Sequence, residues 1–286
     1  MEPTPKRREF LVTAAAMAGA VALGGCSGSA RPSGGRCVLV ELKGGPSQID
    51  TFDPKETSWF SARATPVDGL MLSENFAALA EHARDLAFVR SMVGVHTHHE
   101  LAAAHLRRGL ERLGAWFCVD DSAGSNDPTD EDVSARYVAR LQAALLAAEQ
   151  GPARLVCASL DGWDIHVDGR ERTRVLSRAL DHALDGLFSS TAWRRLRDDT
   201  VILITGEFGR APDLNVLGGR GHHAGCWTAV VAGGAIRGGT VRGATDSRGG
   251  RVLTDETTVD ELHATILAAL GEPSYGDAPA IPSLVA

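Results

Sequence analysis

Short apolar runs alternate with stretches of helical periodicity along most of the chain. The most hydrophobic runs are residues 37–42, 155–160 and 200–205, and the last contains Val-Ile-Leu-Ile with no polar residue inside it. Uninterrupted runs of this length predict strands that are buried on both faces of a sheet. Residues 86–89 and 228–232 are two further candidate strands by the same criterion.

The segments between these runs carry apolar residues at helical spacing. Helices are expected in three of them, within 76–87, 100–113 and 175–187. A final helix is expected to begin at Thr258, because Thr258 and Glu261 have the spacing of a capping box. Gly271 and Pro273 are expected to end it.

This alternation predicts the fold class. Strands that read as continuous apolar runs and are separated by helices predict an α/β fold, with a doubly wound, mostly parallel sheet and helices on both faces. The runs containing Val38, Val156 and Val201 are expected to be neighbouring parallel strands. Ligands of such sheets bind beyond the carboxyl ends of the strands, so polar residues there are the candidates for function.

Composition and charge narrow the class of protein. Of the 286 residues 44% are apolar, which is enough for a large core and excludes a disordered chain. The net charge of −7 argues against a nucleic-acid binder, which needs a basic face. Five cysteines in a chain of this length do not make a disulfide scaffold.

The first 26 residues have the features of an export signal. Arg7 and Arg8 precede an uncharged stretch, residues 11–25, that is shorter than the about 20 residues needed to span a bilayer. The paired arginines resemble a twin-arginine signal, and the Leu-Gly-Gly-Cys that ends at Cys26 resembles a bacterial lipoprotein box. We therefore expect an exported protein, periplasmic or at the cell surface, that a lipid on Cys26 anchors to a membrane.

The remainder of the chain is expected to form one domain. Residues 27–36 are rich in Gly and Ser and predict a flexible linker, followed by a single α/β domain over 37–286. An acidic loop is expected near 118–133, because residues 120–132 contain six acidic residues and no basic one. The ligand spacing of a helix–loop–helix calcium site is missing there, which favours a solvated loop.

Polar residues follow several of the predicted strands. Asp50 and Asp53 come after a Gly-Gly-Pro-Ser turn, and Glu207 follows the most hydrophobic run. Asp164 and His166 lie two residues apart, and in extended backbone this spacing directs both side chains to one side, where they suit a single cation.

His222 lies in a glycine-rich segment before the last candidate strand. Carboxylate and imidazole ligands together suit a divalent metal such as Zn²⁺, Mn²⁺ or Fe, and no thiolate motif competes with them. For each residue there is an ordinary alternative, since an aspartate after a glycine usually caps a turn and a lone histidine is usually a packed or surface side chain. Their recurrence at successive strand ends favours a metal site.

A second group of candidates precedes the helix predicted from residue 100. His96, His98 and His99 lie within four positions of one another, with Thr97 and Glu100 among and beside them. They are candidates to bind a metal, or an anion at the helix N-terminus, and the alternative is that His99 and Glu100 only cap the helix. Both interpretations remain open from the sequence.

Three arginines are candidates to bind the oxyanion of a phosphate or sulfate group. Arg90, Arg210 and Arg220 each carry a guanidinium, which presents a planar fork to such an anion. The alternative is a surface salt bridge, the more common role of an arginine.

Several motifs occur in an order that resembles one bacterial family. They are Gly-Gly-Pro-Ser-Gln-Ile-Asp at 44–50, Val-Arg-Ser-Met at 89–92, His-Glu at 99–100, Gly-Trp-Asp-Ile-His at 162–166, Gly-Glu-Phe-Gly-Arg at 206–210 and Gly-Arg-Gly-His at 219–222. Over about residues 37–275 the chain resembles the family called domain of unknown function 1501, which is similar to the alkaline phosphatase and sulfatase superfamily. The resemblance implies an alkaline phosphatase-like fold with a two-metal site and a shortened middle region.

The resemblance also assigns metal-ligand positions to five residues, Asp50, Asp164, His166, Glu207 and His222. Two neighbouring positions depart from the pattern, because Phe208 stands where the superfamily has a ligand histidine and Gly221 replaces an aspartate usual in the family. No serine or threonine clearly fills the nucleophile position, for which Thr97 and Ser91 are the candidates.

Two functions follow from these residues. The first is a metal-dependent hydrolase acting on a small phosphate or sulfate ester, with Arg210 or Arg220 neutralising developing charge and Thr97 as a further catalytic candidate. The alternative is a catalytically degenerate surface lipoprotein that serves as a binding or assembly module, which Phe208 and Gly221 favour. The retained ligand set favours some bound metal, and of the two functions we expect the hydrolase.

Overall fold

The computed structural model describes residues 34–114, 116–119, 130–273 and 276–286. The expected export signal, and the expected linker up to residue 33, lie outside the described residues. The core of the fold is an eight-stranded sheet with the order β11-β4-β10-β7-β1-β6-β5, and β14 pairs with β4 beside this path. These strands are β1 (Arg36–Leu42), β4 (Leu86–Val93), β5 (Trp116–Val119), β6 (Leu155–Leu160), β7 (Thr200–Thr205), β10 (Trp227–Gly233), β11 (Thr240–Arg242) and β14 (Thr257–Thr258).

The centre of the sheet confirms the expected strand arrangement. β1 lies between β6 and β7 and is parallel to both, with Val38 opposite Val156 and Ile202. Every residue of these three strands is buried, which is the reason their sequences are almost continuously apolar. β10 is antiparallel to β7 and β4, and it is what makes the sheet mostly rather than wholly parallel.

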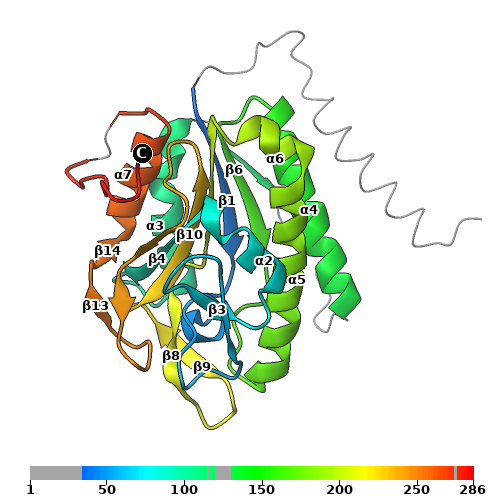
Figure 1. The fold of residues 1–286 in the computed structure, drawn as a ribbon, viewed down its shortest axis with the longest axis vertical. Coiled ribbons are helices and arrows are strands. Elements are labelled where there is room, and N and C mark those ends of the chain that lie inside the picture. The colour runs from blue at the N-terminus through cyan, green and yellow to red at the C-terminus, as the bar shows by residue number, and fades with distance from the viewer. Residues whose placement is uncertain (1–33, 115, 120–129, 274–275) are drawn as a thin grey trace, which may run out of the picture.

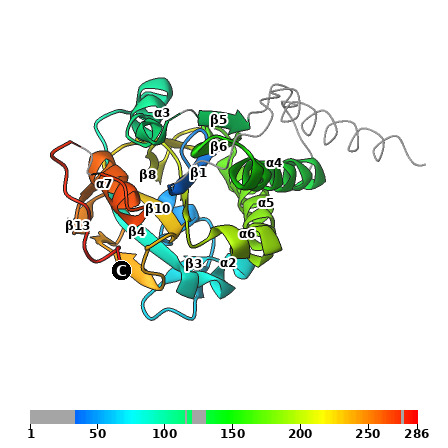
Figure 2. The same cartoon turned by 90° about the horizontal axis from the view of Figure 1, so that it is seen from above.

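Helices cover both faces of this sheet (Figures 1 and 2). They are α2 (Ala77–Glu81), α3 (His99–Arg108), α4 (Asp130–Gln150), α5 (Gly169–Ser189), α6 (Thr191–Leu196) and α7 (Val259–Ala269). α2, α4, α5 and α6 pack on one face, and α3 and α7 pack on the other. This is the doubly wound α/β arrangement that the sequence predicts.

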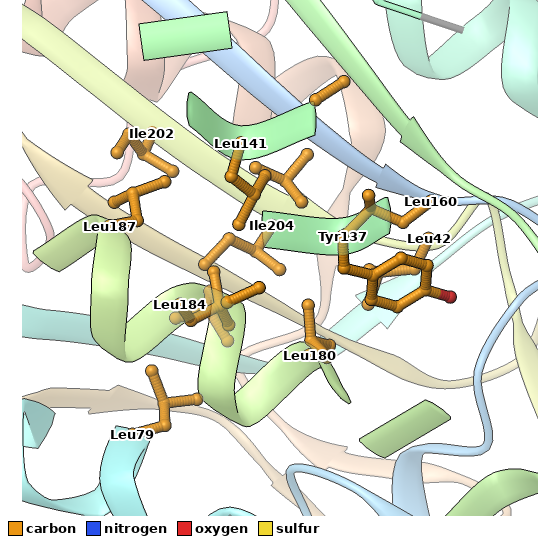
Figure 3. Packing of buried hydrophobic residues seen from close by; sticks show 14 of the residues in the cluster. Leu42, Leu79, Tyr137, Leu141, Leu160, Leu180, Leu184, Leu187, Ile202 and Ile204 are labelled. Carbon is orange, nitrogen blue, oxygen red and sulfur yellow. The ribbon is translucent and has the colours of Figure 1, made fainter. Parts of the chain in front are cut away.

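Alternate residues of each central strand supply the two halves of the core. Val38, Val40 and Leu42 face α4 and α5, whereas Cys37 and Leu39 face α3 and α7. Figure 3 shows the first half, in which side chains of the strands interlock with those of α4 and α5: Leu42, Leu160, Ile202, Ile204, Tyr137, Leu141, Leu180, Leu184 and Leu187. The period of two along β1 therefore divides one strand between two separate apolar layers.

Local signals in the sequence are reproduced at the last helix. Thr258 is the N-cap of α7, where its hydroxyl accepts from the backbone N–H of Glu261 and the Glu261 carboxylate accepts from the N–H of Thr258. The expected capping box is thus confirmed.

The acidic segment differs from the expected loop at both ends. Cys118 and Val119 belong to β5, and Asp132 and Val133 belong to α4, while residues 120–129 lie outside the described residues. β5 is an edge strand with exposed aromatic residues, and α4 begins directly on acidic residues. Neither element continues a clear apolar pattern into the acidic segment, so the sequence does not mark these two boundaries.

Three two-stranded sheets stand outside the central one. They are β2 (Ala62–Ala64) with β3 (Met71–Ser73), β8 (Gly209–Leu214) with β9 (Arg220–His223), and β12 (Ala244–Thr245) with β13 (Val252–Thr254). The β8–β9 hairpin projects beyond the carboxyl ends of the parallel strands, at the bottom of Figure 1. Among the described residues no helix combines the length and the apolar composition needed to cross a bilayer.

Candidate metal centre

The parallel strands deliver a group of polar side chains to one edge of the sheet. β1 ends at Leu42 and leads to Gly44, β6 leads to Asp164 and His166, and β7 leads to Glu207. The β8–β9 hairpin continues from β7 and supplies Arg210 and His222, and α3 follows β4 and begins at His99. Because β1, β4, β6 and β7 all run in the same direction, these loops meet at the same edge.

One carboxylate oxygen lies at the centre of the group. Asp164 Oδ1 is 3.2 Å from His99 Nε2, 2.9 Å from His166 Nε2 and 3.3 Å from His222 Nε2. His222 Nε2 is also 3.1 Å from His99 Nε2 and 3.0 Å from His166 Nε2. Three imidazole nitrogens therefore surround Asp164, all presenting the same ring position.

The hydrogen bonds of the three rings leave Nε2 without a hydrogen in each neutral ring, through Nδ1 in His99 and His222 and through Nε2 itself in His166. His222 Nδ1 donates to the carbonyl oxygen of Thr97 at 2.8 Å, and His99 Nδ1 donates to Glu207 Oε1 at 2.5 Å. His166 Nε2 accepts from Arg210 Nη1 at 3.2 Å. A neutral imidazole has one N–H, so in each ring the nitrogen that faces Asp164 is an acceptor.

Arg210 sets the charge state of the central aspartate. Its Nη2 donates to Asp164 Oδ1 at 2.5 Å, and its other N–H groups donate to the carbonyl oxygens of Gly44, Gly45 and Arg220. Partial burial raises the pKa of Asp164, but the hydrogen bond and charge of Arg210, together with His99 and His166, bring that pKa down to about 2. Asp164 is therefore an anion at neutral pH.

His222 is held neutral by its surroundings. Burial lowers the pKa of His222, and the charges of Arg210 and His99 lower it further, against the hydrogen bonds with Thr97 and Asp164 that raise it. Phe208 forms an apolar floor under the site, with its ring centroid 4.8 Å from that of His99 and 4.9 Å from that of His222. A neutral ring with its free lone pair directed at a carboxylate is the form that binds a metal.

The backbone of Gly44 is hydrogen-bonded to both Glu207 and Arg210. Its N–H donates to both carboxylate oxygens of Glu207, at 3.0 and 3.3 Å, and its carbonyl oxygen accepts from Arg210. Its φ of +110° lies in a region that side chains disfavour, and an added Cβ would fall against the backbone N of Asp164. A glycine is thus required where β1 leaves the sheet.

The donor set fits a divalent cation. Arg210 donates to His166 Nε2 and Asp164 Oδ1, and among the described residues the ligand atoms of His99, Asp164 and His222 lie within 4.8 Å of one another. Imidazole nitrogens with one carboxylate oxygen suit Zn²⁺ and related metals. The side chains of His99, His166 and Asp164 are 32%, 42% and 49% exposed, so the centre is open to a ligand from solvent.

Asp50 and Arg220 form a separate buried ion pair. Arg220 Nε donates to Asp50 Oδ2 at 2.7 Å, and Asp50 Oδ1 accepts from Ser58 and from the backbone N–H of Trp59. The guanidinium of Arg220 also donates to three backbone carbonyls and lies 4.5 Å from the Trp59 ring centroid. Asp50, expected as a metal ligand, and Arg220, expected as an oxyanion clamp, are instead used to fasten the loop after β1 to the β8–β9 hairpin.

Comparison with known families gives the chain its classification. A family model described as "Protein of unknown function (DUF1501)" matches residues 35–127 and 119–274. The chain belongs to the DUF1501 family. No curated protein matches its sequence.

Several solved structures are similar to this DUF1501 chain at low sequence identity. Ps i-CgsB in complex with k-i-k-neocarrahexaose is similar with a TM-score of 0.51 and 10% identity, over 85% of this chain and 73% of that chain. BT1596, a 2-O GAG sulfatase, gives 0.49 at 10% identity over 88% and 74%. A protein in the alkaline phosphatase superfamily from Vibrio parahaemolyticus gives 0.45 at 12% identity over 85% and 68%.

Three of the ligands expected from the sequence of this DUF1501 chain lie together, and two lie elsewhere. Asp164, His166 and His222 converge, whereas Glu207 reaches the centre only through His99, and Asp50 is paired with Arg220. Arg210 contacts Asp164 but has its N–H groups committed to protein acceptors. Thr97 contributes its carbonyl oxygen to His222, and its exposed side chain is outside the described contacts of the site.

His99 lies in the site, and the sequence leaves its role open between a ligand and a helix cap. It is the first residue of α3, and its side chain turns into the centre instead of capping the helix. The density of histidines before a predicted helix was the available signal. It did not distinguish His99 from His96 and His98, because only the direction of the first helical turn decides which ring faces the strand ends.

Proposed function

We propose that this protein is a metal-dependent hydrolase of phosphate or sulfate esters. The observation that carries the proposal is the convergence of the Nε2 atoms of His99, His166 and His222 on Asp164 Oδ1 at the open edge of the sheet. Arg210 donates to Asp164 and His166. The Nε2 lone pairs of His99 and His222, in contrast, face each other and Asp164 at 3.1–3.3 Å, an arrangement that a cation among them stabilises. The superfamily resemblance of the motifs supports ester hydrolysis as the chemistry.

The residues of the chain prepare this site for a cation and an anionic substrate. A bound divalent cation supplies the Lewis acidity that polarises an ester oxygen and lowers the pKa of water. Asp164, His99 and His222 would hold it, with His166 beside them, and Arg210 keeps Asp164 ionised. The exposed sides of these ligands leave an approach for the ester.

Water is the attacking group that the arrangement favours. Where α3 begins, the side chain facing the centre is His99, and the neighbouring Thr97 offers its backbone carbonyl to His222. A covalent intermediate on a serine or threonine is therefore not part of the proposal. His166 lies beside the site, where its Nε2 accepts from Arg210 Nη1 at 3.2 Å and lies 2.9 Å from Asp164 Oδ1.

A second candidate function is a metal-containing binding module without catalysis. This candidate is favoured because both arginines near the site are hydrogen-bonded within the chain. Arg210 donates to backbone carbonyls and to Asp164, and Arg220 donates to Asp50. Neither guanidinium offers a free fork for the charge that develops on an ester in the transition state. The hydrolase should turn over an ester substrate, and the binding module should not.

The decisive experiment is metal analysis of the purified full-length chain followed by assays on aryl phosphates and aryl sulfates. We expect bound zinc or manganese and hydrolysis that falls by more than about 100-fold in Asp164→Asn and His222→Ala, which lose a direct ligand. His182→Ala, an exposed histidine on α5, is the matched control and should behave as the wild type. Bound metal without turnover would favour the binding module, and absence of bound metal from freshly purified and metal-supplemented protein would refute both.

We also propose that the protein works outside the cytoplasm as a lipoprotein. The support is the sequence of the leader, with Arg7-Arg8 before a short apolar stretch and Cys26 after it. Replacing both arginines by lysine should retain the protein in the cytoplasm, and Cys26→Ser should release it from membranes. Normal export of the first variant, or continued membrane association of the second, would contradict the corresponding part of this proposal.

A further inference from the structure

We propose that Glu207 is a positioning residue for His99 and not a metal ligand. In this arrangement its carboxylate holds the Nδ1–H tautomer of His99 and aims the Nε2 lone pair of that ring at the centre. The inference deepens the proposed function and rests on it, since it assigns a role within the same site.

The geometry separates Glu207 from the centre by the width of one imidazole. Glu207 Oε1 contacts His99 Nδ1 at 2.5 Å, whereas Asp164 and His222 contact the opposite nitrogen, His99 Nε2, at 3.2 and 3.1 Å. Among the described residues, the group whose ligand atoms lie close enough to share one ion contains His99, Asp164 and His222, and Glu207 is outside it.

The carboxylate of Glu207 is held in place from its other side. Both of its oxygens accept from the backbone N–H of Gly44, at 3.0 and 3.3 Å, and its side chain is 1% exposed. The backbone of Gly44 packs closely against that of Asp164, since a Cβ added at Gly44 would fall 2.2 Å from the backbone N of Asp164. Turning Glu207 to ligate a cation would break the bonds to Gly44 and to His99 and leave a buried N–H unpaired.

The other contacts of the His99 ring restrain its tautomer less. Phe208 packs against one face, with ring centroids 4.8 Å apart, and His222 packs edge-on, with centroids 4.4 Å apart. Asp164 Oδ1 lies 3.2 Å from Nε2 and competes for the ring proton, but the 2.5 Å contact with the buried Glu207 is shorter and favours the proton on Nδ1. Outer carboxylates of this kind fix the tautomer of a ligand histidine and raise its basicity, and their loss typically lowers metal affinity about 10–100-fold.

The test compares Zn²⁺ affinity in the wild type, Glu207→Gln and His99→Ala, measured on the full chain by competition with a chromophoric chelator. Glu207→Gln keeps the shape of the side chain, and we expect it to bind one Zn²⁺ about 10–100-fold more weakly with the same ligands in the X-ray absorption spectrum. In the His99→Ala background, Glu207→Gln should have no further effect, since the residue acts through that ring. Exposed Glu74→Gln is the control and should leave affinity unchanged.

A second readout does not need the metal. In the metal-free protein, ¹⁵N NMR of the histidine rings should show His99 as the Nδ1–H tautomer, and Glu207→Gln should shift it toward a mixture of tautomers. Thermal unfolding of each variant verifies that it folds, and Glu207→Asp, which withdraws the carboxylate by one methylene, replaces Glu207→Gln if that variant does not.

The outcomes distinguish this inference from the proposed function. Unchanged Zn²⁺ affinity in Glu207→Gln, loss of one oxygen ligand from its absorption spectrum, or effects of the two substitutions that add independently would overturn the positioning role while leaving a metal site intact. If the wild type binds no metal, the proposed function fails, and the NMR comparison alone then decides whether Glu207 sets the tautomer of His99.

Discussion

Gly44→Ala adds one methyl group at a position where the structure predicts a large loss of stability. Gly44 has a φ of +110°, and a Cβ would lie 2.7 Å from the carbonyl carbon of Trp163 and 2.9 Å from the Cα of Asp164. Contacts below 3.0 Å to backbone cannot be relieved by turning a side chain. The positive φ costs an alanine about 1–2 kcal/mol, and overpacking against rigid neighbours costs about 1–3 kcal/mol more.

The total loss of about 2–5 kcal/mol is large enough to measure directly. For a domain of this size each kcal/mol lowers the melting temperature by about 2–4 °C, so Gly44→Ala should melt about 4–20 °C below the wild type. Metal affinity should fall with it, because the same glycine binds Glu207 through its N–H and Arg210 through its carbonyl.

Two other glycines separate the causes in the same assay. Gly69 has a φ of +74° but nothing within 4 Å of its added Cβ, so Gly69→Ala should show only the backbone cost. Gly186 lies within α5 with open space around it, and Gly186→Ala should be neutral or stabilise by about 0.5–1 kcal/mol. If Gly44→Ala lost no more stability than Gly69→Ala, the close packing of the loop after β1 against Asp164 would be wrong as an explanation.

Two further predictions concern groups buried between α3 and the rest of the fold. Burial lowers the pKa of His263 to about 4, so the unfolded chain takes up a proton first, and the stability that the neutral ring contributes is present above pH 6.5 and lost as the pH falls toward 4. Denaturant unfolding from pH 7 to 4 should therefore show a loss of about 3 kcal/mol that is absent in His263→Gln, and parallel curves for the two proteins would contradict it. Arg107 Nη1 donates to both oxygens of the fully buried Glu41, at 3.1 and 3.0 Å. Arg107→Met should cost about 3–5 kcal/mol at pH 7 and the double variant with Glu41→Gln clearly less, whereas equal losses in single and double variants would show that Arg107 acts by packing alone.

The central strands can be predicted from the sequence because burial on both faces requires a continuous run of apolar residues. β1, β6 and β7 are covered on both faces, so nearly every residue in them is apolar, and the shortness of these runs distinguishes them from buried helices. The sequence of β10 does not indicate that this strand is antiparallel to its neighbours. An antiparallel strand buried on both faces has the same composition as a parallel one, and its direction follows from a short connection through the β8–β9 hairpin.

The short strands β5, β11 and β14 are not predicted from the sequence, because each of them contains very few residues. β5 is paired on one side only and exposes Trp116 and Phe117, and β11 and β14 are three and two residues long. Such strands exist because a neighbouring strand offers free hydrogen-bonding groups, and their own sequence does little to specify them.

Polar residues that follow apolar runs predict the edge of the sheet where reactive side chains gather, but the packing of loops and helices sets which of those side chains meet. Asp164, His166 and His222 could be selected because polar residues at the carboxyl ends of parallel strands share one edge. That Asp50 would turn to Arg220, and that His99 would enter the site with Glu207 behind it, depends on atoms brought together from positions 108 to 170 residues apart. Ion pairs and imidazole contacts are made over about 3 Å, and only the packed arrangement of loops and helices defines separations that small.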